Sequence, residues 1–112
     1  MYVDKQNEFA DSQVVTASAI STNVIDLGAT NTLKDIGSGQ NVYLIVQVDA
    51  AATAAGAATV TFSLESDSTE NLATSATVHY TSTAIGKAAL TAGSTQLAIR
   101  LPAGNYERYL GV

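Results

Sequence analysis

Residues 42–48 decide the fold class, because their sequence, VYLIVQV, is the strongest strand signal in the chain. β-Branched and aromatic residues favour strands, and a run that is apolar at almost every position is typical of a strand covered on both faces. We therefore predict a strand here that lies centrally in the fold.

Further strands are predicted on the C-terminal side of this run, where apolar and polar residues alternate. The clearest are 59–66, 77–81 and 96–101, and a last strand begins at Tyr106. The Pro-Ala-Gly sequence after Leu101 is typical of a type I turn. The side chains predicted to face inward are Val60, Phe62 and Leu64 in the first of these strands, and Leu97, Ile99 and Leu101 in the third.

Two stretches rich in small residues separate the strands. Residues 29–40, with Gly37-Ser38-Gly39, are predicted to form a loop, and they lack the Gly-Lys-Ser/Thr sequence of a phosphate-binding loop. Residues 84–94 are predicted to form a loop with a brief helical turn. Short strands with turns between them indicate one all-β domain over residues 1–112, a jelly-roll-like antiparallel β-sandwich.

The N-terminal quarter is polar at its start and then rich in Thr, Ser and Val. Residues 1–15 are predicted to form an extended N-terminal arm. Alternation over 15–19 indicates an extended piece that Ile20 interrupts with a bulge or bend, and 24–27 is a second short strand. The apolar residues here either begin the sandwich or, in residues 4–15, contact another subunit, since terminal segments seldom become ordered without docking.

At the other end, the sequence stops at Leu110-Gly111-Val112, within an apolar strand rather than in a polar tail. Either a partner covers this end or the natural gene product continues beyond it, and we favour the second. The C-terminal strand is then incomplete.

The composition argues against several classes of protein. Charged residues make up 13% of the chain, compared with roughly 25% in soluble domains. Neutral hydroxyl groups cost less to cover than charges, which favours a protein that works inside an assembly. The net charge is −5 and the five basic residues are scattered, so we expect no direct binding to nucleic acid.

Cysteine is absent, which excludes disulfides, thiolate chemistry and cysteine zinc sites. The N-terminus lacks the basic and apolar segments of a signal peptide, and the alanine-rich run 50–58 is too short to span a bilayer. We expect a soluble protein made in the cytoplasm, without a membrane partner, cofactor or metal.

His79, on the predicted strand 77–81, is the only histidine. Catalysis through a triad requires a nucleophile and an orienting carboxylate beside the histidine. Ser63, Ser82 and Glu65 are the candidate neighbours, but no nucleophile motif accompanies them. We therefore interpret His79 as an ordinary strand residue and predict that the protein is not an enzyme.

Glu65, Asp67 and Glu70 could offer oxygen ligands to a calcium ion. Their spacing does not match an EF-hand loop and lacks its central glycine, so a solvated turn is the better interpretation. No catalytic, cofactor-binding or metal-binding residue is assigned.

Tyr106 and Tyr109 are three residues apart and so lie on opposite faces of a strand, one expected in the core and the other at an interface. Arg100 and Arg108 flank the proline turn, where they either pair with carboxylates of a partner or remain solvated. The candidate residues for an interface with a partner protein or another subunit are Phe9, Val14, Val15, Arg100, Arg108 and Tyr109.

Three segments in a fixed order carry a resemblance to a known family. The first runs from Asp4 to Phe9, includes Asp11-Ser12-Gln13, and continues as STNVIDLG at 21–28. The second is VQVD at 46–49 with TAAGAATV at 53–60, and the third is IRLPAG at 99–104 with ERYL at 107–110. Together they resemble the capsid cement (decoration) proteins of tailed bacteriophages, of the Bordetella-phage type.

The resemblance implies a jelly-roll domain on the outer surface of a virion, bound to the HK97-like major capsid protein and to itself as a homodimer or trimer. It also implies one more strand beyond the end of this sequence. We therefore expect a structural cement protein that stabilises the assembled head by bridging capsid protein subunits. The alternative is a virion module that binds carbohydrate or the host surface, which requires an exposed aromatic platform.

Overall fold

The computed structural model describes residues 5–28, 42–73 and 75–112. Over these ranges the chain forms eight β-strands and two short 3-10 turns, and every strand pair is antiparallel. The prediction of an antiparallel all-β fold is confirmed. The predicted loop at 29–40, with its Gly-Ser-Gly sequence, lies outside the described residues.

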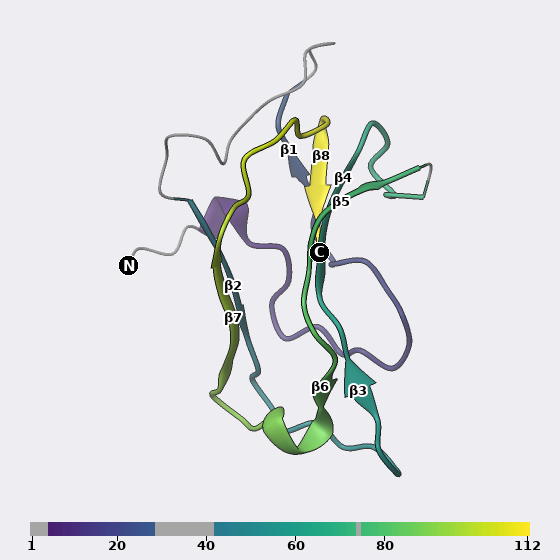
Figure 1. Ribbon diagram of the computed structural model, residues 1–112, viewed down its shortest axis with the longest axis vertical. Coiled ribbons are helices and arrows are strands. Elements are labelled where there is room, and N and C mark those ends of the chain that lie inside the picture. Colours follow the sequence, from purple (N-terminus) through teal and green to yellow (C-terminus); the bar gives the residue numbers. More distant parts are fainter. Residues whose placement is uncertain (1–4, 29–41, 74) are drawn as a thin grey trace.

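One layer is a four-stranded sheet with the order β1-β8-β4-β5 (Figure 1). Its strands are β1 (Ile25–Asp26), β8 (Tyr109–Gly111), β4 (Ser63–Asp67) and β5 (Thr77–Thr81). β8 pairs with β1 on one side and with β4 on the other. Segments from the two ends of the chain therefore meet in the same sheet.

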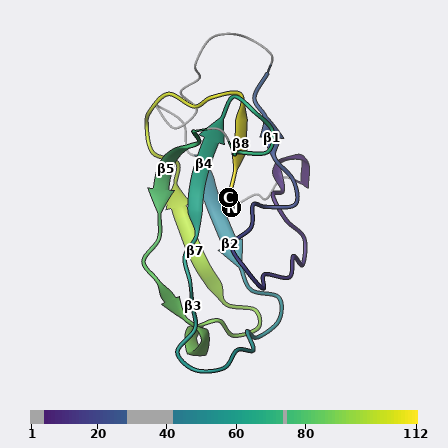
Figure 2. The same ribbon diagram turned by 90° about the vertical axis from the view of Figure 1, so that its right-hand side faces the viewer.

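The opposite layer contains β2 (Tyr43–Gln47) and β7 (Thr95–Arg100), which pair with each other. Figure 1 shows this pair beside the four-stranded sheet, and Figure 2, turned by 90°, shows β4 and β5 in front of it. The two layers form a β-sandwich. A small ladder of β3 (Thr59–Val60) and β6 (Ile85–Gly86) lies at one end, next to the 3-10 turn Lys87–Ala89.

The core fills the space between the layers. Alternate residues of each strand point inward, as period-two side-chain geometry requires, and the predicted inward residues of 59–66 and 96–101 are buried or half-buried. Tyr106, which leads into β8, is fully buried and confirms that one of the two tyrosines belongs to the core. The buried apolar cluster consists of Leu44, Leu64, Leu97, Leu101, Tyr106 and Leu110.

The strand at 42–48 is confirmed as β2, but the prediction that it lies centrally is wrong. Within the described residues β2 pairs with β7 alone, and Tyr43 is 47% exposed. Leu44 and Val46 face the core, whereas the side chains that alternate with them reach solvent. An apolar run indicates a strand but does not show whether both of its faces are covered.

The structure differs from two further predictions and agrees with a third. The strand at 59–66 is divided at Phe62, because the Ser82 hydroxyl accepts the Phe62 N–H at 2.9 Å while the Ser82 N–H donates to the Phe62 carbonyl at 2.8 Å. The predicted extended piece at 15–19 is wrong, since these residues form exposed bends and no strand. The brief helical turn within 84–94 is confirmed at Lys87–Ala89.

Candidate functional site

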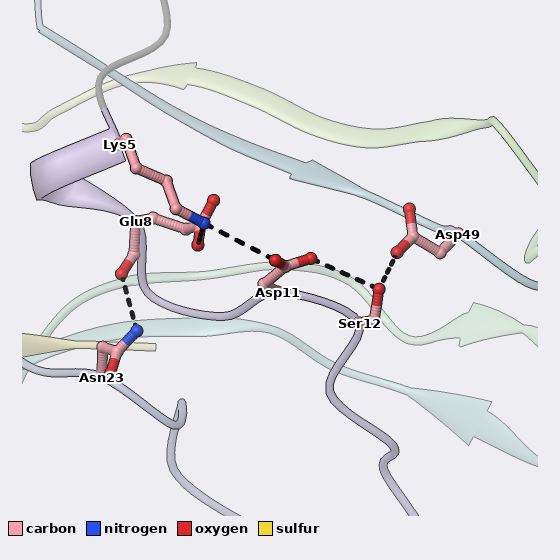
Figure 3. A network of polar contacts seen from close by, with 6 residues as sticks. All are labelled: Lys5, Glu8, Asp11, Ser12, Asn23 and Asp49. Atoms are coloured by element: carbon pink, nitrogen blue, oxygen red, sulfur yellow. Dashed lines mark hydrogen bonds and ion pairs between the residues drawn. The ribbon is translucent and has the colours of Figure 1, made fainter.

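Residues 1–4 of the predicted arm lie outside the described residues. The rest of the arm lies on the sandwich and is held there by polar contacts. It begins at the 3-10 turn Lys5–Asn7, and the Lys5 ammonium pairs with Glu8 at 2.5 Å and with Asp11 at 3.5 Å. The hydrogen bond to Glu8 raises the pKa of Lys5 above its ordinary value. Ser12 then donates a hydrogen bond to Asp49, just beyond β2 (Figure 3). The arm is thus attached to the second layer.

Phe9 belongs to the packing of this chain. Its half-buried side chain packs against the core cluster, and its carbonyl accepts the Asn23 N–H at 2.7 Å. The Asn23 amide also donates to the Glu8 carbonyl at 3.4 Å (Figure 3). Of the predicted interface residues in the arm, Phe9 is therefore the one that packs against the core of its own chain.

Gln13 closes a loop, residues 13–22, that we call the Gln13 loop. Its side-chain Nε2 donates to the Ile20 carbonyl at 2.9 Å. Its Oε1 accepts the Thr22 N–H at 2.8 Å and the Thr22 hydroxyl at 3.0 Å. Both ends of one amide therefore satisfy backbone groups of the returning segment, much as a strand neighbour would.

The far end of the Gln13 loop is fixed to the last strand. The buried Ser21 donates its N–H to the Val112 carbonyl at 2.7 Å, and its hydroxyl accepts the Val112 N–H at 3.3 Å. Asn23, one residue beyond the loop, donates its N–H to the Phe9 carbonyl. At the other end, Ser12, one residue before the loop, is hydrogen-bonded to Asp49. Both ends of the loop are therefore anchored to the sandwich.

Between these anchors the Gln13 loop presents apolar side chains to solvent. Val14 is 82% exposed, Val15 57% and Ile20 41%. The two valines are predicted interface residues, and both lie on this loop. Ile20 is not among the predicted residues, although the break in alternation at that position is a signal that could have identified it.

Arg108 and Tyr109 lie together at the junction of β1 and β8. The Arg108 guanidinium forms two hydrogen bonds with the Asp26 carboxylate, at 3.0 and 2.9 Å, which raise the pKa of Arg108. Its Cζ also lies 4.8 Å from the centroid of the Tyr109 ring. The arginine is therefore engaged within the chain, in a half-exposed pair that salt would weaken.

Arg100 lies at a different place, at the end of β7 opposite Tyr43 of β2. Its side chain is exposed and forms no hydrogen bond or ion pair with the other described residues. The predicted interface residues are thus divided among the Gln13 loop, the β1–β8 junction and the β2–β7 ladder, with Phe9 packed against the core.

His79 is part of a polar network inside the sandwich. Its Nε2 lies 2.7 Å from the Ser66 hydroxyl, which also accepts the Glu107 N–H at 3.1 Å. The imidazole stacks on Tyr106 with ring centroids 4.1 Å apart. Burial lowers the pKa of His79 below its ordinary value, and the charge of Glu107 acts in the opposite direction.

The neighbour of His79 is Ser66 and not Ser63 or Ser82, the serines considered from the sequence. Ser63 pairs with Thr81 on the adjacent strand, and Ser82 binds the backbone at Phe62. Ser66 is fully buried, so its hydroxyl is out of reach of a substrate. Its geometry suits a structural hydrogen bond between β4 and β5.

Asp67 shapes the turn after β4. Its buried carboxylate accepts hydrogen bonds from the Ser68 and Thr69 hydroxyls at 3.3 and 3.1 Å. Among the described residues there is no group of three or more His, Cys, Asp or Glu side chains placed to hold a metal ion. None of the helices in the same ranges has the length and apolar character of a membrane span.

One comparison with known proteins identifies a relationship. The model of the Bbp16 family matches residues 9–112, which include the Gln13 loop and all eight strands. A search of curated proteins gives no significant match.

Proposed function

This chain belongs to the Bbp16 family, and we propose that it is a capsid cement protein that binds the outer surface of an assembled bacteriophage head. The observation that carries this proposal is the resemblance of three ordered segments to cement proteins of the Bordetella-phage type. The family match over residues 9–112 covers the second and third of these segments and most of the first. The partners are the major capsid protein and further copies of this chain, as a homodimer or trimer.

The proposed mechanism is thermodynamic and involves no enzymatic chemistry. A protein that binds the assembled shell, but not its separated subunits, shifts the equilibrium away from disassembly. Many copies on one head multiply contacts that are individually weak. Bridging of neighbouring capsid proteins would then help the head to resist the pressure of packaged DNA.

The structure supports this role through its surface chemistry. The sandwich carries few charges, and its exposed loops are rich in small uncharged residues, as at residues 50–58, where alanine predominates. Such a surface can be covered by another protein at a small desolvation cost. The anchored Gln13 loop adds apolar side chains in a fixed arrangement.

The test compares heads assembled with and without this protein. Heads that lack it should release DNA or break at a lower temperature, and adding the purified protein should restore the original temperature. Release of DNA can be followed with an intercalating dye during heating. If both kinds of head have equal thermal stability, the proposal is wrong.

The alternative role in carbohydrate or host-surface binding depends on an aromatic platform. Among the described residues, Tyr43 is the strongly exposed aromatic side chain, and Arg100 is its cross-strand neighbour. A glycan array probed with the wild type and with Tyr43→Ala distinguishes the two functions. A cement protein gives no hits, whereas a glycan-binding module gives hits that the substitution removes.

A further inference from the structure

The Gln13 loop concentrates exposed apolar side chains to an unusual degree. Six large apolar residues are strongly exposed in the described part of the chain, and three of them are Val14, Val15 and Ile20. Single exposed apolar residues are common on protein surfaces and need no explanation. Three of them on one ten-residue loop exceed such scattered exposure, and this makes the loop the candidate interaction site.

The loop is also held in shape before any partner arrives. The Gln13 amide makes three hydrogen bonds across it, and Ser21 fixes its end to Val112. A loop that is already ordered loses less conformational entropy on binding than a free one. This arrangement therefore favours docking of a preformed surface.

The charge pattern indicates the chemistry of the partner. Residues 12–25 contain no charged side chain, although the whole chain has a net charge of −5. A phosphate backbone has no basic group to bind on this loop. The complementary surface is an uncharged, apolar patch on a protein.

The small size of the loop surface favours the capsid shell over a second copy of this chain as the binding partner of the loop. Three side chains offer far less than the roughly 800 Å² per partner that a stable complex of two proteins usually buries. Such a contact cannot hold two free molecules together by itself. On a shell, however, the same weak contact is repeated and is reinforced by the other contacts of each bound copy.

From these observations we infer that the Gln13 loop is the element that docks on the capsid shell, with Val14, Val15 and Ile20 seated on an uncharged apolar patch of the major capsid protein. This inference rests on the proposed function and adds the contacting element. Gln13 acts as a positioning residue, because it holds the loop without belonging to the apolar surface.

The first experiment measures binding of purified protein to heads assembled without it, by co-sedimentation over a range of concentrations. The double substitution Val14→Ser with Val15→Ser should weaken apparent affinity about tenfold or more, since two apolar side chains are lost from the contact. The matched control is Val78→Ser, because Val78 is 52% exposed on β5. Figure 2 shows β5 on the opposite side of the sandwich from the arm, so this control should bind as the wild type does.

A second variant tests the positioning role. Gln13→Ala keeps both valines but removes the three hydrogen bonds across the loop. It should bind heads several-fold more weakly, and the amide hydrogens of the loop should exchange with solvent faster than in the wild type. The control is Gln47→Ala on β2, whose amide makes a single long hydrogen bond to Thr95 at 3.4 Å.

The outcomes separate this inference from the proposed function. If the wild type binds heads and the double serine variant binds equally well, the loop is not the docking element, although the cement function stands. If the double variant binds heads normally but loses self-association in light scattering, the occupant is a second copy and the inference is wrong. If the wild type does not bind heads at all, the proposed function fails first.

Discussion

Two regions of this molecule use hydrogen bonds in the same way but treat apolar side chains in opposite ways. Around Tyr106, the tyrosine hydroxyl donates to the Pro102 carbonyl at 2.5 Å and Ser66 joins His79 to the Glu107 N–H. In the Gln13 loop, one amide makes three comparable bonds. Both regions are held in a defined shape, yet only the first removes its apolar surface from water.

Order and burial are therefore separate properties of this fold. Leu64 and Tyr106 stabilise the sandwich because they leave water on folding. Val14 and Val15 remain in water after folding, so their apolar surface is still available to a partner. We therefore expect substitutions in the first region to affect stability and substitutions in the second to affect binding.

The largest effect on stability is expected for Leu64→Ala. Leu64 is 1% exposed at the centre of the core cluster, and loss of its side chain leaves a cavity. The free energy of unfolding should fall by about 2–5 kcal/mol, measured by urea denaturation. A loss under about 1 kcal/mol would mean that the core around Leu64 is loosely packed.

A smaller effect is expected for Ser66→Ala, which breaks the polar network beneath His79. The Glu107 N–H, in a partly buried hydrogen bond, loses its acceptor, and His79 loses its partner, so we expect a loss of about 1–3 kcal/mol. Ser63→Ala on the same strand is the control, because Ser63 pairs with Thr81 near the surface. Equal effects of the two substitutions would contradict the structural role of Ser66.

A pH dependence of stability should follow from His79. Burial lowers its pKa in the folded state below 6.5, so around that pH the unfolded chain binds a proton more readily than the folded chain. The contribution of neutral His79 to the free energy of unfolding is fully present above about pH 6.5, and it is lost as the pH falls through the folded-state pKa. Denaturation at several pH values should show this decline, and His79→Gln should flatten it.

The smallest effect on stability is expected for Val14→Ser. Val14 is exposed, so the free energy of unfolding of the variant should stay within about 0.5 kcal/mol of that of the wild type. The same denaturation curves as for Leu64→Ala provide the measurement. A large loss would show that the Gln13 loop supports the core, and the distinction between the two regions would then disappear.

Local sequence patterns predicted those parts of the fold that depend on neighbouring residues. Alternation located β4, β5 and β7 and identified Leu64 and Leu97 as inward-facing. The same patterns could not show that β1 pairs with β8, because those strands lie at opposite ends of the chain. They also led to the wrong prediction of an extended piece at 15–19, where apolar residues alternate but have no neighbouring strand.

The candidate site was predictable only in part, for a related reason. Val14 and Val15 were identified as interface residues from their apolar character in a terminal segment. Phe9 has the same character, but the structure packs it against the core. Arg108 is likewise engaged, since Asp26 lies next to it only after the two end strands have paired.

The all-β class, the positions of the main strands and the near absence of charge beyond Asp11 in the first quarter are evident from the amino-acid sequence, because they depend on residue type and on spacing along the chain. Which apolar residues are buried and which are displayed follows from the folded arrangement instead. Burial depends on what packs against each side chain, and for the Gln13 loop that was set by contacts to Asp49 and Val112, distant in the sequence.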